Sequence, residues 1–131
     1  MQPVLGGQMI KRVTIMTRKP GMTREDFADY WIKRHAPLLA SHPSVKRFTI
    51  NVTHEYLRFG VRNEDLEDPL RTTILTKTPD GIVELWFEDR ESMEAMYKSE
   101  FTAQLVADAG NFVGAIVTFI MDEHEIKSDA A

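Results

Sequence analysis

Residues 23–38, TREDFADYWIKRHAPL, are the stretch that best indicates how this chain folds. Thr23 is followed at the third position by a carboxylate, the capping-box pattern that satisfies backbone N–H groups at a helix start. Phe27, Trp31 and His35 recur every four residues, so they share one face of that helix. The stretch predicts a helix whose aromatic stripe finishes in a histidine.

The end of this helix is expected at Pro37, because proline lacks a backbone N–H and disfavours helical geometry at the residue before it. His35 then has two interpretations. It can bond a terminal backbone carbonyl and interact favourably with the helix dipole. Alternatively, it can act as a general acid or base at the mouth of an apolar cleft.

The composition indicates one domain over residues 1–131, with a core over residues 9–122 and frayed termini. The apolar fraction of 43% and the charged fraction of 27% are usual for a soluble globular protein. A net charge of −4 without a basic cluster argues against nucleic acid as a partner. The lack of cysteine excludes disulfides and agrees with a cytoplasmic location. We expect no signal peptide and no membrane span, since an apolar run of about 18 residues is missing.

Four segments have the alternation and β-branched composition of strands: residues 9–17, 45–54, 82–87 and 114–122. Two further helices with apolar inner faces are predicted over residues 90–98 and 100–109. Strand, helix, strand, strand, helix, strand is the order of the ferredoxin-like split βαβ arrangement, an α+β fold with a four-stranded antiparallel sheet and helices on one face. Because the strands are apolar on both faces, we expect the bare face to be covered in a homodimer, as a dimeric α+β barrel.

Residues 55–79 are predicted to form a long loop, which is the alternative cover for the bare sheet face. Residues 71–75 are a candidate for a short extra strand. The acidic part of the loop, NEDLEDP, lacks the DxDxDG spacing of a calcium site, so we interpret it as a solvated lid. The sequence has no GxGxxG, Walker A or HExxH motif, and its histidines lack metal-ligand spacing. We therefore expect neither a metal nor an organic cofactor.

Glu84 lies between Ile82 and Trp86 on one face of the third strand. If the helices bury it without a partner, its pKa rises and it becomes an acid–base group. The alternative is a structural ion pair with Arg12, Arg47 or another nearby cation.

The candidate catalytic residues are His35, Glu84 and His54, which ends the second strand beside the long loop. Trp31 and Trp86 are expected to form the walls of a pocket, although aromatic residues at such spacing are more often core. The full set of expected ligand contacts is Phe27, Trp31, Phe48, Asn51, Asp80, Trp86 and Met96. Of these, Asn51 is a candidate donor to a substrate oxygen, and Asp80 also belongs to an Asp-Gly turn.

Three segments resemble the ethyl tert-butyl ether degradation (EthD) family. MTREDFADYWIKRHAPL resembles its F-x-x-Y/W-W-x-x-x-H-x-P-L signature, VKRFTINVTH its second strand, and DGIVELWFEDRESM its D-G-x-x-E-x-W-F segment. The resemblance covers residues 9–122. It implies a dimeric α+β barrel related in fold to muconolactone isomerases, methylmuconolactone methylisomerases and small cofactor-free polyketide-tailoring enzymes. His35 resembles the helix-end histidine of the methylisomerases, whereas Phe48 stands where some relatives place a tyrosine.

We therefore expect a cofactor-independent enzyme, an oxidoreductase, isomerase or lyase, that moves protons on a small hydrophobic compound of cyclic, aromatic, lactone or polyketide-like type. The alternative is a non-catalytic binding or accessory protein for a hydrophobic intermediate or a partner oxygenase. A haem-handling protein of similar barrel fold is a third possibility. The geometry separates the first two, because an enzyme should bring His35 and Glu84 to one cavity, whereas a carrier needs only an apolar cavity.

Overall fold

The computed structural model of the protein describes residues 9–55 and 78–129. Its elements are β1 (Ile10–Arg18), α1 (Arg24–Tyr30), η2 (Trp31–His35), α2 (Ala36–Ala40), β2 (Val45–Val52), β3 (Gly81–Phe87), α4 (Arg90–Tyr97), α5 (Glu100–Ala109) and β4 (Val113–Met121). The predicted order of strands and helices is confirmed. Most of the predicted loop over residues 55–79, including the strand candidate at 71–75, lies outside the described residues.

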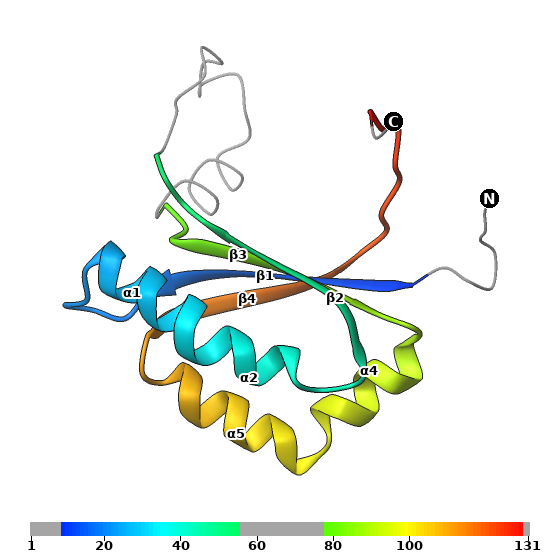
Figure 1. Ribbon diagram of the computed structural model, residues 1–131, viewed down its shortest axis with the longest axis horizontal. Helices are drawn as coiled ribbons and strands as arrows, with labels where there is room; N and C mark the ends of the chain where they lie inside the picture. The colour runs from blue at the N-terminus through cyan, green and yellow to red at the C-terminus, as the bar shows by residue number, and fades with distance from the viewer. Residues whose placement is uncertain (1–8, 56–77, 130–131) are drawn as a thin grey trace, which may run out of the picture.

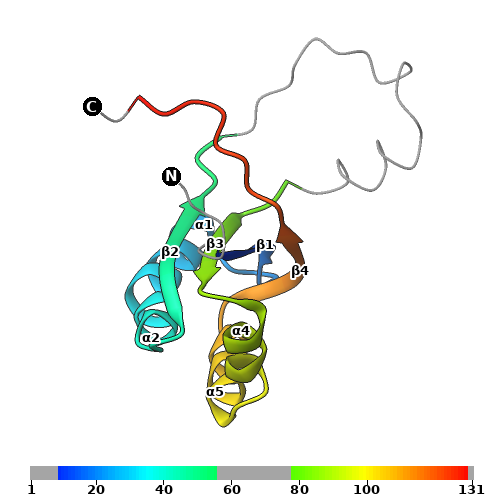
Figure 2. The same cartoon turned by 90° about the vertical axis from the view of Figure 1, so that its right-hand side faces the viewer.

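The four strands form one antiparallel sheet in the order β2-β3-β1-β4. Figure 1 shows the labelled helices on one side of this sheet, and Figure 2 shows the strands side by side in that order. The ferredoxin-like fold predicted from the sequence is therefore confirmed. Among the described residues, no helix is long and apolar enough to cross a membrane.

The core lies between the sheet and the helical layer. Phe27 and Phe112 have no exposed surface, and their rings pack with centroids 5.5 Å apart. On β3 the residues that face this core are Val83, Leu85 and Phe87, all of them buried. Because side chains alternate along a strand, the residues between them point to the other face of the sheet.

The first helix does not end at Pro37 as predicted. It continues through the π-helical turn of η2, Trp31–His35, into α2, which contains Pro37 in its first turn. The N–H of Ala36 bonds to the carbonyl of Trp31, five residues earlier. This wider turn tolerates proline, because the α-helical hydrogen-bond ladder is already interrupted there. It also carries His35, and π turns occur frequently at functional sites.

Trp31 lies against the start of β3. A Cβ atom added to Gly81 would fall 2.3 Å from Trp31 Cζ3, so the glycine makes room for the indole. The neighbouring Asp80 is buried, and it accepts hydrogen bonds of 2.7 Å from both the backbone N–H and the guanidinium of Arg18. Asp80 therefore connects the end of β1 to the start of β3. Gly81 leaves the space that lets the helix pack on the sheet through Trp31.

The sheet face turned away from the helices carries a row of exposed apolar side chains. Val117, Phe119 and Met121 on β4 are 48%, 44% and 47% exposed, respectively. They alternate with Thr118, which bonds Thr14 on the helix side, so they belong to the opposite face. We call this the outer face.

Candidate ligand cavity and its histidine

A cavity of about 260 Å³ lies between the helix-facing side of the sheet and the helices. Most of its lining is apolar and includes Met16, Trp31, Leu39, Val83, Leu85 and Leu105. Val106 on α5 and Ile116 on β4 also line it and are 66% and 60% exposed, so the cavity opens between these two elements. Small-molecule binding sites are usually apolar cavities with a few polar groups, as this one is.

His35 reaches the cavity from η2 and is held in place by residues around α5. Its Nδ1 lies 2.8 Å from Asp108 Oδ2, and its side chain is only 12% exposed. Tyr30 donates a hydrogen bond of 2.6 Å to the other oxygen of Asp108, and Asn111 donates one of 2.8 Å to the Tyr30 hydroxyl. The ring of Phe112 packs against the imidazole, with centroids 5.0 Å apart.

Asp108 decides how the imidazole is oriented. Burial raises the pKa of this carboxyl group, but the hydrogen bonds from Tyr30 and His35 outweigh it and hold the pKa below its usual range. An ionised carboxylate only accepts hydrogen bonds, so His35 presents Nδ1–H to it. The Nε2 atom of the neutral ring then carries a lone pair, and it has no hydrogen-bond partner within residues 9–55 and 78–129.

Five other polar side chains line the cavity: Arg12, Thr14, Tyr97, Thr102 and Thr118. The hydroxyl groups of Thr14 and Thr118 lie 2.9 Å apart and share one hydrogen bond. The guanidinium of Arg12 lies 4.0 Å from the ring centroid of Tyr97. Burial raises the pKa of Tyr97, so its phenol is neutral at physiological pH.

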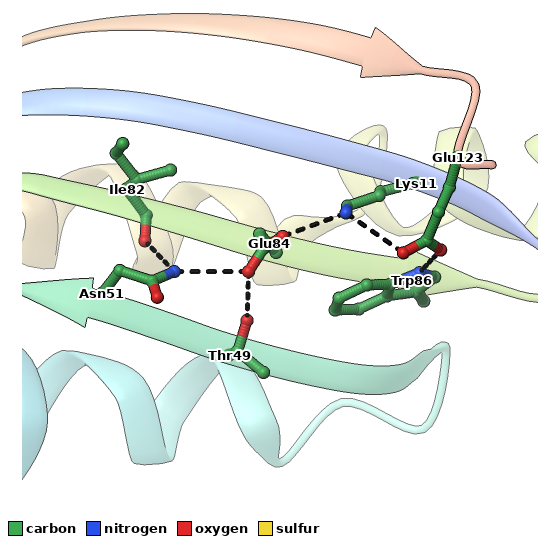
Figure 3. Close-up of polar contacts among 7 residues, drawn as sticks. All are labelled: Lys11, Thr49, Asn51, Ile82, Glu84, Trp86 and Glu123. Atoms are coloured by element: carbon green, nitrogen blue, oxygen red, sulfur yellow. Dashed lines mark hydrogen bonds and ion pairs between the residues drawn. The ribbon is translucent and has the colours of Figure 1, made fainter. Parts of the chain in front are cut away.

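Glu84 does not share this cavity, so the expected convergence of His35 and Glu84 is wrong. Figure 3 shows Glu84 on the outer face, where its Oε2 lies 2.9 Å from Lys11 Nζ. Thr49 donates a hydrogen bond of 2.8 Å to Oε1. The hydrogen bonds from Lys11 and then Thr49 lower the pKa of Glu84, the reverse of what an acid–base role under the helices required. The structural ion pair is present, and its cation is Lys11.

The alternation of β3 explains this placement. Val83, Leu85 and Phe87 form a wholly apolar set, and burying that set against the helices removes the most hydrophobic surface from water. Glu84 belongs to the alternate set and must therefore face outward.

Trp86 lies on the outer face with Glu84, so the two tryptophans do not enclose one pocket. Its Nε1 donates a hydrogen bond of 2.8 Å to Glu123, and Lys11 and Arg47 lie 4.8 and 4.3 Å from the centroid of its ring. Figure 3 shows Trp86 beside Lys11 and Glu123. Trp31 alone of the two tryptophans lines the cavity.

The other expected site residues also lie away from the cavity lining. Phe27 and Met96 are buried in the core, and Phe48 packs against it. Asn51 bonds Glu84 on the outer face, Asp80 is bound by Arg18, and His54 is exposed beyond the end of β2.

The sequence interpretation missed Asp108. It follows the inward-facing Leu105 by three residues, so a carboxylate on the inner side of the predicted helix was a usable signal.

In the two described stretches of the chain, no group of three or more His, Asp or Glu side chains is placed to hold a metal ion. The polar groups of the cavity are instead an imidazole, a guanidinium, a phenol and three hydroxyl groups, from Thr14, Thr102 and Thr118. These groups can donate hydrogen bonds, accept a proton and bind an anion.

The sheet order and the one-sided helical layer define a ferredoxin-like α+β protein. The profile of the EthD domain matches residues 19–116, well over half of the chain, so the chain belongs to the EthD family. No curated protein matches the sequence.

Several solved structures share this fold. An EthD family protein from Bacillus halodurans is similar with a TM-score of 0.63 and 16% identity, over 89% of this chain and 100% of that one. An EthD-like protein from Ralstonia eutropha gives 0.63 and 18%, over 94% and 99% of the two chains. A dimeric ferredoxin-like protein of unknown function from Thermobifida fusca gives 0.60 and 12%, over 92% and 95%. At such identities the likeness shows the fold alone.

Proposed function

We propose that this protein is a cofactor-independent enzyme that transfers a proton to or from a small, largely apolar cyclic compound. The observation that carries the proposal is the state of His35. Its imidazole forms part of an apolar cavity wall, Asp108 holds Nδ1, and Nε2 has no hydrogen-bond partner among the described residues. A histidine held in this way is suited to act as a general base.

In this mechanism a proton leaves the bound compound and passes to His35 Nε2. The imidazolium that forms lies 2.8 Å from Asp108, whose negative charge stabilises it. The hydroxyl pair of Thr14 and Thr118 supplies a donor for negative charge that develops on a substrate oxygen. An isomerase returns the proton to another atom of the substrate, and a lyase expels a leaving group together with its electron pair.

The cavity volume limits the size of the compound. The volume of about 260 Å³ is slightly below the usual range for ligand pockets, which begins at about 300 Å³. It suits a molecule of one or two rings, of the aromatic, lactone or polyketide-like kind, and is too small for a porphyrin. The volume therefore does not favour a haem-handling function.

The second candidate function is carriage of a hydrophobic intermediate, or assistance to a partner oxygenase, without catalysis. The position of Glu84 on the outer face favours it, because the cavity lacks the second acid–base group that the sequence suggested. A carrier needs the apolar lining and no turnover, so the two candidates differ in a measurable way.

We also propose that two copies pair through the outer face. Val117, Phe119 and Met121 are close to half exposed there, and contiguous apolar surface on a sheet usually marks an interface. The relative from Thermobifida fusca is described as dimeric, which supports the same arrangement here. The cysteine-free composition agrees with a cytoplasmic location for such a dimer.

Solvent isotope exchange tests the proton transfer. The protein is incubated in D2O with a panel of cyclic ketones, lactones and phenols, and mass spectrometry follows deuterium uptake. We expect wild type to label at least one compound, and His35→Gln to label it about a hundredfold more slowly. His124→Gln is the matched control, because His124 is exposed in the C-terminal tail. Binding without any exchange by wild type would favour the carrier instead.

A further inference from the structure

Arg12 places a positive charge in a cavity that is otherwise mostly apolar. It extends from β1 on the same strand face as Thr14 and Met16, and it is partly buried. No carboxylate oxygen lies within 4.0 Å of its guanidinium in the described part of the chain, whereas Arg18 has such a partner in Asp80. A partly buried cation without a counter-ion favours an anion from elsewhere.

The contact between Arg12 and Tyr97 leaves the guanidinium able to bind a ligand. The guanidinium carbon lies over the face of the ring, 4.0 Å from its centroid. Stacking of this kind uses the flat surface of the guanidinium, while its five N–H donors point outward within the plane. Tyr97 therefore orients Arg12, and although its hydroxyl oxygen also interacts with the guanidinium, one oxygen cannot occupy all five donors, so others remain for a carboxylate.

The negative charge of Asp108 does not neutralise Arg12, because the two groups belong to opposite ends of the cavity. Asp108 is next to Ala109, while Thr102 bonds the carbonyl of Met96 near Tyr97. Thr102 and Ala109 both line the cavity from α5. Seven residues of α-helix separate them, which corresponds to about 10 Å.

We infer that the cavity binds a cyclic carboxylate, with Arg12 as its anion-binding residue and His35 facing the far side of the ring system. A carboxylate fits the planar fork of a guanidinium with two parallel hydrogen bonds. The orientation toward His35 rests on the proposed proton transfer, but the anion site itself does not. The inference narrows the ligand class from apolar cyclic compounds to those that carry a carboxylate.

Paired probes test this site. The ligands are 2-naphthoate and the uncharged 2-naphthamide, which match in shape and differ in charge, and calorimetry gives the two dissociation constants. We expect wild type to bind the carboxylate about tenfold or more tightly than the amide. Arg12→Gln should remove the preference. Arg12→Lys should keep part of it, because lysine retains the charge but loses the fork.

Arg47→Gln is the matched control, because Arg47 lies over Trp86 on the outer face. It should keep the wild-type preference. If Arg12→Gln does not fold, the Nε–H resonance of Arg12 in wild type gives the same information: at equal occupancy, naphthoate should shift it further downfield than naphthamide does.

Several results would overturn the anion site: no preference in wild type, no naphthoate binding at millimolar concentration, or a preference that survives in Arg12→Gln. His35→Gln separates this inference from the proposed function, because it should still prefer naphthoate. If it does so and proton transfer is also unchanged, the proposed function fails and the anion site stands. If the preference disappears in His35→Gln and persists in Arg12→Gln, the imidazole binds the anion and the inference fails.

Discussion

Asp108 on α5 binds the Nδ1 atom of His35 on η2 at 2.8 Å, although 73 positions separate the two residues in the sequence. This contact links the first helix to α5 across one side of the cavity. A carboxylate on Nδ1 fixes which nitrogen of the imidazole is available to a ligand. The chemistry of the site therefore depends on how two helices pack, as well as on the histidine itself.

Asp108→Asn is expected to change the tautomer of His35. An asparagine amide can donate a hydrogen bond to Nδ1, which favours the ring with the proton on Nε2 and removes the free lone pair. Nitrogen-detected NMR should show Nδ1–H in wild type and Nε2–H in the variant, with turnover lowered about tenfold or more. Asp29→Asn is the control, because Asp29 is exposed on the surface and, among the described residues, forms its ion pair with Lys33. A wild-type ring with its proton on Nε2 would contradict the assigned orientation.

Acid should weaken the fold through the carboxylates of the outer face. Lys11 and Thr49 lower the pKa of Glu84, and the hydrogen bond from Trp86 lowers that of Glu123. Such groups bind protons more weakly when folded than when unfolded. Their stabilisation is therefore present above the ordinary glutamate value of 4.5 and is lost as pH falls through the lower folded values.

Urea unfolding at a series of acidic pH values measures this effect. The free energy of unfolding should decrease as the pH falls below 4.5, and Glu84→Gln should flatten part of that decrease. Glu91→Gln, an exposed change on α4, should leave the wild-type slope. An unchanged slope in Glu84→Gln would show that its ion pair adds no stability.

Phe119→Asp should separate the proposed dimer. Phe119 is 44% exposed on the outer face, and a charge there would be buried in a sheet-to-sheet interface without a partner. Light scattering after size exclusion should give a dimer for wild type and a monomer for the variant. Ile32→Asp is the matched control, because Ile32 is 51% exposed on the helical layer. A monomeric wild type would contradict the proposed dimer. Dissociation by Ile32→Asp and not by Phe119→Asp would place the interface on the helical layer.

Gly81→Ala should destabilise the protein by displacing Trp31. The added methyl group would lie 2.3 Å from Cζ3 of the indole, and overpacking of this kind typically costs about 1–3 kcal/mol. Thermal unfolding should show a lower Tm for this variant. At Gly110 the nearest atom to an added Cβ is 3.4 Å away, so Gly110→Ala should have little effect. Equal Tm values for Gly81→Ala and wild type would mean that the indole moves without cost.

The sequence was sufficient for the fold because periodicity is a local property. The alternation in β3 and the four-residue spacing of Phe27, Trp31 and His35 are both visible along the chain. The apolar set Val83, Leu85 and Phe87 even contained the information that Glu84 faces away from the helices. A glutamate between two apolar neighbours also suggests a buried functional group, but the alternation of the strand outweighs that suggestion.

The site depended on contacts between distant segments, which periodicity does not encode. The partner of His35 is on another helix, and the cation beside Glu84 is fixed by the pairing of β1 with β3, which places Lys11 opposite Trp86. The continuation past Pro37 requires a π turn, and a single sequence gives no strong signal for such a turn.

The most direct test of proton transfer is the exchange rate of one bound compound, compared between wild type and His35→Gln at equal occupancy. We predict that the variant binds with a dissociation constant within about twofold of wild type and exchanges about a hundredfold more slowly. Exchange by the variant at the wild-type rate would mean that another group moves the proton, and the assignment of His35 would be wrong.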